Sequence, residues 1–117
     1  MQQLFAYGTL KPGNAPTEIA DAVRSLRAVG RGQVRGRLLQ MDGYPGAILD
    51  ADGDEIKGVV LQIPNRATLK QLDLYEEYDP RNRKKSLFLR KKTRVALESG
   101  GHTECWIYEF NPRSKDK

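Results

Sequence analysis

The chain alternates between short apolar segments and turn-forming residues, and this alternation limits its fold more than any other feature. Segments rich in Val, Ile, Leu and aromatic residues are separated by Gly, Pro and Asp, which is typical of strands joined by tight turns. Strands and helices do not alternate regularly, so a doubly wound parallel sheet is disfavoured. The pattern predicts an α+β fold, a small mixed β-barrel of about six strands with two or three short flanking helices.

Two turn signals predict which strands are paired. Asp52, Gly53 and Asp54 predict a hairpin between residues 47–51 and 56–63. A turn through residues 99–101, in which His102 is also expected to lie, predicts a longer hairpin near the C-terminus. The expected strands cover residues 3–7, 29–41, 43–50, 56–63, 86–98 and 103–110.

Two segments have apolar residues at helical spacing. The first is expected to run from about residue 16 to residue 27, with Thr17 as its N-cap. The second is expected to begin at Asn65, which can cap it, and to reach about Tyr78, where Pro80 ends it. In each helix the apolar residues form one face that can be buried against the sheet.

Length and cysteine content bound the organisation of the chain. With 117 residues, 38% of them hydrophobic, it can form one core without disulfides, and Cys105 is its single cysteine. We expect one domain over residues 1–112 and a disordered basic tail over residues 113–117. No stretch approaches the roughly 20 apolar residues of a membrane helix, so we expect a soluble, cytoplasmic protein without a membrane partner.

Several classes of active site are disfavoured. His102 is the only histidine and Cys105 the only cysteine, so neither a histidine metal cluster nor a thiolate zinc site is expected. No serine or cysteine has an implied base, which argues against a Ser or Cys hydrolase. The sequence therefore predicts a site without a bound metal.

Positive charge is concentrated in one stretch. The formal net charge is +5, and residues 81–94 contain eight Lys or Arg and no acid. This stretch could form a nucleic-acid-binding surface with Phe88 as a stacking residue, or a solvated loop and sheet edge. Nucleic acid is the less favoured partner, because single-strand binders usually offer several aromatic platforms and here Phe88 is alone.

The segment YGTLKPG, residues 7–13, is the first candidate for chemistry. A strand that ends in Gly leaves backbone N–H groups unpaired, and these can bind an anion such as a carboxylate. The segment lacks the spacing of a nucleotide-binding phosphate loop. The alternative interpretation is an ordinary turn after a strand.

The segment LDLYEEYDP, residues 72–80, is the second candidate. It places four carboxylates at a helix C-terminus, where negative charge is unfavourable unless cations neutralise it or a function retains it. Glu76 lies three residues after Asp73, on the helix face that carries Leu72, so Glu76 is expected to point inward while Glu77 faces solvent. The alternative interpretation is a solvated acidic helix end.

Together, FAYGTLKPG and LDLYEEYDP resemble the γ-glutamylcyclotransferase-like family, in its AIG2-type branch, which includes γ-glutamylamine cyclotransferases. The segments GYPGAI and SLFLR, at residues 43–48 and 86–90, occur in the order expected for that family. The resemblance implies a small mixed β-barrel with flanking helices. It also implies an enzyme that releases 5-oxoproline from a γ-glutamyl amine or peptide.

The resemblance assigns roles to individual residues. The backbone of Tyr7, Gly8, Thr9 and Leu10 is implied to line the pocket for the γ-glutamyl group of the substrate. Glu76, the Glu of the D-x-[FY]-E pattern, is implied to be the catalytic general acid/base. Both assignments fall on the two segments that the residue chemistry had singled out.

Two further substrate-binding positions follow from the resemblance. Tyr44, in the segment YPG, is expected to border the same cavity. Phe88 is found where such proteins often carry a Tyr two residues before an Arg, here Arg90, so a hydroxyl is missing. This departure leaves the identity of the γ-glutamyl compound open.

The chemistry needs few catalytic groups. The α-amine of a γ-glutamyl amide can attack its own γ-carbonyl and close a five-membered lactam, so the substrate supplies the nucleophile. One carboxylate can move both protons, and no nucleophilic side chain, metal or cofactor is needed. The alternative is a non-catalytic module that binds small molecules with the same fold. Nothing in the sequence indicates the leaving group or the oligomeric state.

Overall fold

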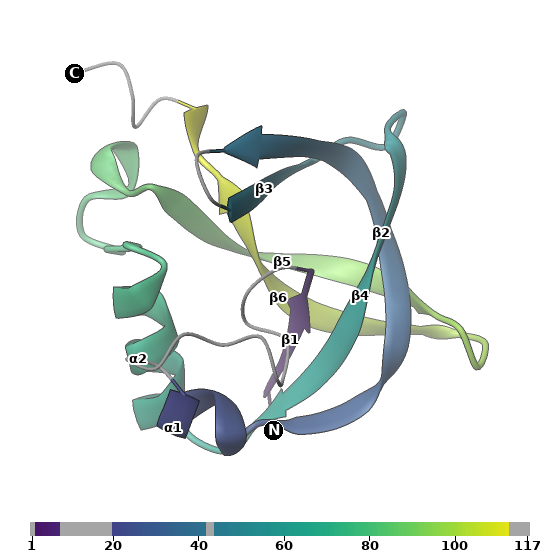
Figure 1. Ribbon diagram of the computed structural model, residues 1–117, viewed down its shortest axis with the longest axis horizontal. Helices are drawn as coiled ribbons and strands as arrows, with labels where there is room; N and C mark the ends of the chain where they lie inside the picture. The colour runs from purple at the N-terminus through teal and green to yellow at the C-terminus, as the bar shows by residue number, and fades with distance from the viewer. Residues whose placement is uncertain (1, 8–19, 42–43, 113–117) are drawn as a thin grey trace.

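The computed structural model describes residues 2–7, 20–41 and 44–112, and the predicted tail at 113–117 lies outside this part (Figure 1). The described residues form six strands, two α-helices and a short 3-10 helix. In chain order these are β1 (Gln2–Ala6), α1 (Ala20–Arg24), β2 (Arg27–Met41), β3 (Tyr44–Leu49), β4 (Asp54–Ile63), α2 (Arg66–Tyr75), η2 (Arg83–Lys85), β5 (Phe88–Leu97) and β6 (His102–Phe110).

The strands close into a barrel. β4 is antiparallel to both β1 and β2, and β2 is antiparallel to β3. β6 completes the ring through single parallel pairings, of Ala47 in β3 with Glu109 and of Leu4 in β1 with Trp106. β5 lies outside this ring of five, antiparallel to β6 from Phe88 to Ala96 and to β2 at its C-terminal end (Figure 1). The predicted α+β barrel is confirmed.

β2 is the longest strand and bends around the barrel. It pairs with β4 through residues 27–36 and with β3 through residues 36–41, so Gly36 contacts both partners. A Cβ atom at Gly36 would lie 2.4 Å from the carbonyl oxygen of Ile48. The close approach of the strands therefore requires glycine at this position.

The predicted hairpin between residues 47–51 and 56–63 is wrong. A turn does form there, with the Gly53 N–H donating to the Asp50 carbonyl at 2.9 Å. β3 and β4 do not pair with each other, because β2 lies between them in the sheet order and pairs with both. The turn signal identified the bend correctly, but the partners of the two strands were set by β2.

The second predicted hairpin is confirmed. β5 and β6 pair in register from Phe88 with Phe110 to Ala96 with His102. The turn contains Gly100 and Gly101 at φ values of 107° and 79°, which residues other than glycine rarely adopt. His102 was expected in this turn and is instead the first residue of β6.

The helices agree with the predicted faces but not with every boundary. Val23 and Leu26 are buried as expected, while the predicted cap Thr17 lies outside the described residues. At α2, the Asn65 carboxamide oxygen accepts from the Thr68 N–H at 2.9 Å, which confirms the cap. α2 ends at Tyr75, earlier than predicted, because the chain turns into a left-handed conformation at Glu77. No helix in the described residues is long and apolar enough to cross a membrane.

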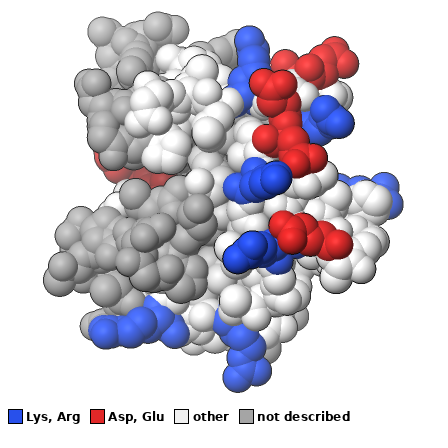
Figure 2. All heavy atoms as spheres, turned by 45° about the vertical axis from the view of Figure 1, so that its right-hand side comes forward, with Lys and Arg blue, Asp and Glu red and all other residues white. Residues whose placement is uncertain are grey.

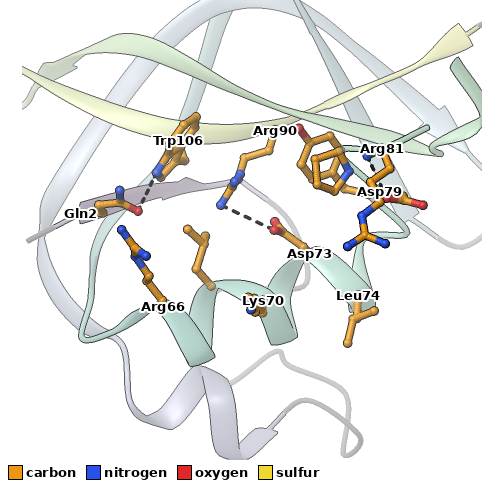
Figure 3. Close-up of a pocket in the computed structure, with 12 residues that line it drawn as sticks. Gln2, Arg66, Lys70, Asp73, Leu74, Asp79, Arg81, Arg90 and Trp106 are labelled. Atoms are coloured by element: carbon orange, nitrogen blue, oxygen red, sulfur yellow. Dashed lines mark hydrogen bonds and ion pairs between the residues drawn. The ribbon is translucent and has the colours of Figure 1, made fainter. Parts of the chain in front are cut away.

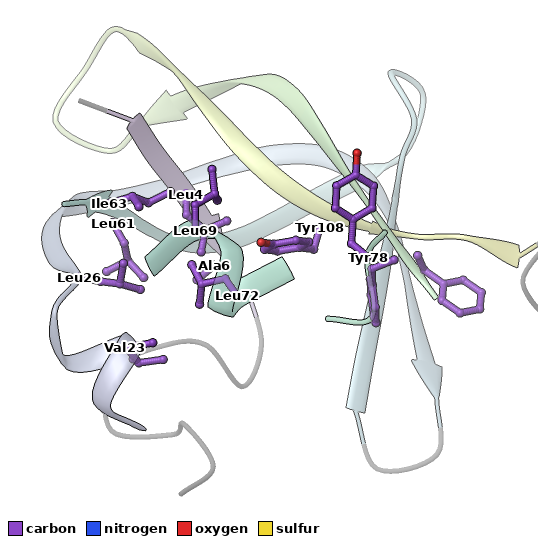
Figure 4. Close-up of a cluster of buried hydrophobic side chains, with 13 residues drawn as sticks. Leu4, Ala6, Val23, Leu26, Leu61, Ile63, Leu69, Leu72, Tyr78 and Tyr108 are labelled. Carbon is purple, nitrogen blue, oxygen red and sulfur yellow. The ribbon is translucent and has the colours of Figure 1, made fainter. Parts of the chain in front are cut away.

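Two clusters of buried side chains lie on opposite faces of the sheet. Leu4 and Ala6 of β1 belong to the cluster that also contains the apolar faces of α1 and α2 (Figure 4). Phe5, between them in sequence, belongs to the second cluster with Val60, Val95 and Ile107. Since successive strand side chains point to opposite faces, one short strand supports both clusters. The helices are thus held against the outside of the barrel, with the end of α2 near β5 and β6.

Candidate active site

Glu76 lies at the end of α2 with a partly buried side chain. Its backbone N–H caps the helix by donating to the Leu72 carbonyl at 2.9 Å. Burial, and to a lesser extent the charge of Glu77, raises the pKa of the Glu76 carboxyl from 4.5 to about 7. A carboxyl that titrates near neutrality can both accept and donate a proton at that pH.

The turn after Glu76 has the hydrogen bonds of a Schellman motif. The Tyr78 N–H donates to the Asp73 carbonyl at 2.9 Å, and the Glu77 N–H donates to the Leu74 carbonyl at 3.2 Å. Glu77 occupies the position usually taken by glycine, at φ 54°, and is exposed. The inward Glu76 and the outward Glu77 agree with the expected faces, and the sharp turn keeps Glu76 at the tip of the helix.

Tyr7, the first residue of the predicted strand-end motif, lies near Glu76. Its hydroxyl donates to the Tyr108 carbonyl at 2.6 Å and accepts from the Ala47 N–H at 3.1 Å. Burial raises the pKa of the Tyr7 phenol, and the charges of Glu76 and Glu109 raise it further, whereas the Ala47 N–H lowers it. The tertiary structure therefore brings the end of β1 and the end of α2 together, and Tyr7 is protonated at neutral pH.

Tyr108 ties the acidic end of α2 to the sheet. Its hydroxyl donates to Asp73 Oδ1 at 2.6 Å, and Asp73 Oδ2 lies 3.5 Å from Nη1 of Arg90. Burial raises the pKa of the Asp73 carboxyl, while the Tyr108 hydrogen bond and the charge of Arg90 oppose that rise. Burial is also the main reason why the Tyr108 pKa is raised. Because Asp73 lies less than one helical turn before Glu76, these contacts hold the helix end that carries Glu76.

Tyr108 was assigned no functional role from the sequence, and this contact was therefore missed. A signal was available, since the register of the second hairpin places Tyr108 directly opposite Arg90. Arg90 is the residue that the family pattern places after Phe88. The missing information was that α2 packs against this pair of strands.

Glu109 is a second buried carboxylate that the sequence interpretation missed. Its Oε2 accepts from the Leu49 N–H at 2.7 Å, and its Oε1 lies 2.6 Å from Nζ of Lys91. It lies close enough to Tyr7 for its charge to raise the Tyr7 pKa. The Glu109 side chain thus links β3 to β6, two strands whose backbones pair only at Ala47 and Glu109.

The remaining predicted site residues are placed only in part. Gly8, Thr9 and Leu10 lie outside the described residues, and so does the side chain of Tyr44, whose backbone pairs with Met41. Phe88 is buried in the helix-side cluster, with its ring edge-on to Phe110 at a centroid distance of 6.0 Å. Its contribution to substrate binding stays a prediction.

The basic stretch at residues 81–94 is partly neutralised by acids of β6 and α2. Arg90 pairs with Asp73, Lys91 pairs with Glu109, and Lys92 Nζ lies 3.3 Å from Glu104 Oε1. Figure 2 shows a face of the protein on which basic and acidic side chains are interspersed. Residues 90–92 therefore belong to a strand whose positive charges are paired with acids. Among the described residues, no group of three or more His, Cys, Asp or Glu could hold a metal ion.

Comparison with known proteins decides the family. A family model described as "Gamma-glutamyl cyclotransferase, AIG2-like" matches residues 4–117. The chain belongs to this family. It is 33% identical over 113 residues to the gamma-L-glutamyl-butirosin B gamma-glutamyl cyclotransferase of Niallia circulans, covering 95% of this chain and 68% of that protein. It is 27% identical to a putative gamma-glutamylcyclotransferase of Methanocaldococcus jannaschii, covering 97% of this chain and 88% of that protein.

The fold comparison agrees with the family assignment. The crystal structure of an AIG2-like protein from Mus musculus superposes with a TM-score of 0.75 at 24% identity, covering 93% of this chain and 76% of that one. The family model and the two named relatives show that the present chain is an enzyme of the γ-glutamyl cyclotransferase kind. The resemblance noted in the sequence is confirmed for both the family and the fold.

Proposed function

We propose that this AIG2-like protein releases 5-oxoproline from a γ-glutamyl amine or γ-glutamyl peptide, with Glu76 as the general acid/base. The observation that carries the proposal is the Glu76 carboxyl, which titrates near pH 7 at the tip of α2, close to the end of β1. Groups with such perturbed pKa values are concentrated at functional sites. The family supports the reaction class, and the chemistry of the site supports the residue.

The proposed reaction begins with proton transfer from the substrate α-ammonium to Glu76. The freed amine attacks the γ-carbonyl carbon, and the new C–N bond gives a tetrahedral oxyanion. As the intermediate collapses, the bond to the leaving nitrogen breaks and Glu76 returns its proton to that nitrogen. The ring nitrogen, still protonated after its attack, releases its extra proton to solvent and becomes the N–H of the lactam. The products are 5-oxoproline and a free amine, and the carboxylate is regenerated. General acid/base catalysis of this kind typically contributes about 10²–10⁴-fold in rate.

The other predicted residues bind the substrate in this proposal. Backbone N–H groups of Gly8, Thr9 and Leu10 would bind the α-carboxylate or the oxyanion, since they follow a strand end that points toward Glu76. The Tyr7 backbone would line the same pocket, while its hydroxyl serves as a structural support because its one proton is donated to the Tyr108 carbonyl. Tyr44 would border the pocket at the start of β3.

The proposed substrate class is that of γ-glutamyl compounds. The Niallia circulans relative is named for a γ-L-glutamyl group on butirosin B, which supports γ-glutamyl compounds as the substrate class. A reducing, cytoplasmic setting would suit the single buried Cys105.

The test is detection of 5-oxoproline by mass spectrometry from a panel of γ-glutamyl amines and dipeptides. Wild-type protein should release it, and Glu76→Gln should be at least 100-fold slower, at the lower end of the usual contribution of general acid/base catalysis. Glu77→Gln is the matched control, because it removes the neighbouring exposed carboxylate and should retain most of the activity. Equal rates for wild type and Glu76→Gln would refute the assigned role. Ligand binding without turnover across the panel would indicate a non-catalytic module.

A further inference from the structure

A cavity in the form of an open groove lies between α2 and the β5–β6 hairpin (Figure 3). Its volume is about 660 Å³, within the range of about 300–1,000 Å³ that is common for small-molecule sites. Its lining includes one face of α2 and the Trp106 and Arg90 side chains, but not Glu76. The reaction proposed above makes no use of this groove.

The groove carries more positive than negative charge. It is lined by four basic and two acidic side chains: Arg66, Lys70, Arg81, Arg90, Asp73 and Asp79. Both acids already have partners, since Asp73 accepts from Tyr108 and pairs with Arg90, and Asp79 Oδ1 accepts from the Arg81 N–H at 2.9 Å. Within the part of the chain described, Arg66, Lys70 and the Arg81 guanidinium have no ion pair. The uncompensated charge favours an anionic ligand.

Arg90 gives the strongest indication that an anion binds in the groove. Its Nε and Nη1 atoms are buried and have no hydrogen-bond acceptor among the described residues, although Nη1 lies 3.5 Å from Asp73 Oδ2 as an ion pair. The guanidinium lies over the Trp106 ring at 4.4 Å and near the Tyr78 ring at 5.6 Å. Aromatic faces attract the cation, but they do not replace an oxygen acceptor. Buried donors without acceptors are rare in native proteins, and an oxyanion in the groove would supply the missing acceptors after a small shift of the side chain.

The walls of the groove are apolar. They are formed in part by Leu69, Tyr78, Pro80 and Trp106. Leu74 of α2 also lines the groove, and its apolar side chain is 77% exposed. A small inorganic anion would leave these walls uncovered, whereas an anion with an apolar body would cover them. We propose that this groove is a second binding site, and that its ligand is a small organic anion with a carboxylate, sulfonate or phosphate group on an apolar body.

Trp106 makes the proposal directly testable. It is the only tryptophan in the chain, and its indole Nε1–H donates to Gln2 Oε1 at 3.0 Å inside the groove. A ¹H–¹⁵N spectrum therefore has one indole signal, which reports on this site alone. The probes are 1-anilinonaphthalene-8-sulfonate, the uncharged N-phenyl-1-naphthylamine with nearly the same body, and inorganic sulfate.

The sulfonate probe should bind one molecule per chain and shift the indole signal, and the uncharged probe and sulfate should each bind roughly tenfold more weakly or worse. The double variant Arg66→Gln with Lys70→Gln should weaken sulfonate binding roughly tenfold, since each rim cation contributes a modest amount. Both residues are exposed, so the fold should tolerate the change. The matched control is Arg31→Gln with Lys57→Gln, which removes the same charge from exposed strand positions and should leave binding unchanged.

Three results would overturn the proposal. They are sulfonate binding without a shift of the indole signal, equal affinity for the charged and uncharged probes, and equal weakening by the two double variants. Absence of binding at low salt would overturn it as well, because electrostatic attraction is strongest there. Binding is read without turnover, so a failure here is distinguishable from a failure of the proposed reaction.

Discussion

Replacing Glu76 by Gln should stabilise the protein at alkaline pH while it removes activity. In the unfolded chain the Glu76 carboxyl titrates near 4.5, and in the folded protein near 7. Below about pH 4.5 it is protonated in both states and contributes no difference in stability. Between these pKa values the unfolded state releases the proton that the folded state retains, so folding stability falls as the pH rises through this window.

The size of this stability change follows from the rise in the Glu76 pKa on folding. A difference of about 2.5 pKa units corresponds to about 3 kcal/mol, and because the Glu76 side chain is only partly buried we expect about 2–3 kcal/mol. The amide side chain introduced by Glu76→Gln cannot ionise and avoids this cost. The stability gain of Glu76→Gln should therefore be near zero at about pH 4 and reach its full size above about pH 7.5.

Urea unfolding followed by Trp106 fluorescence, at a series of pH values, measures this difference. Any cost of the amide that is independent of pH cancels when the difference is compared across the series. Glu77→Gln is the control and should show only a small effect, because the charge of Glu77 is the lesser cause of the Glu76 shift. A gain in unfolding free energy of Glu76→Gln over wild type that stays constant with pH, or that decreases as the pH rises, would refute this prediction. The Glu76 carboxyl would then not retain its proton in the folded protein.

Four further outcomes are expected. The kcat/KM of the wild type should rise with pH through an inflection near 7, as Glu76 ionises, and the residual activity of Glu76→Gln should lack that inflection. Tyr108→Phe removes the donor to Asp73 and should cost about 1–3 kcal/mol in urea unfolding and lower kcat more than it changes KM; an unchanged kcat would argue against positioning through α2. Glu109→Ala should cost about 1–3 kcal/mol by leaving the Leu49 N–H unpaired, and Glu109→Gln should cost less because its amide oxygen can still accept; equal losses would contradict this account. Glu77→Gly should raise the free energy of unfolding by about 0.5–1 kcal/mol by relieving the left-handed conformation, and a destabilised variant would show that the Glu77 side chain makes an important contact.

The sequence by itself determined the elements that depend on neighbouring residues. The strand segments, the cap at Asn65 and the glycine turn before β6 follow from local patterns, and the structure confirms each of them. The spacing of Asp73 and Glu76 predicted that Glu76 points inward, because helical periodicity decides which residues share a face, while its catalytic role was implied only by the family resemblance. Two short motifs together identified the family, which the comparisons confirm.

Only the tertiary structure decided which distant segments lie together. The turn at residues 50–54 indicated a bend, but not that β2 would separate β3 from β4. The contact of Tyr108 with Asp73 and the burial that raises the pKa of Glu76 arise because α2 packs against the outside of the barrel. Only the structure showed that three cations of residues 81–94 are paired with acids from β6 and α2. Such pairings depend on contacts between residues far apart in the chain, and no local pattern contains them.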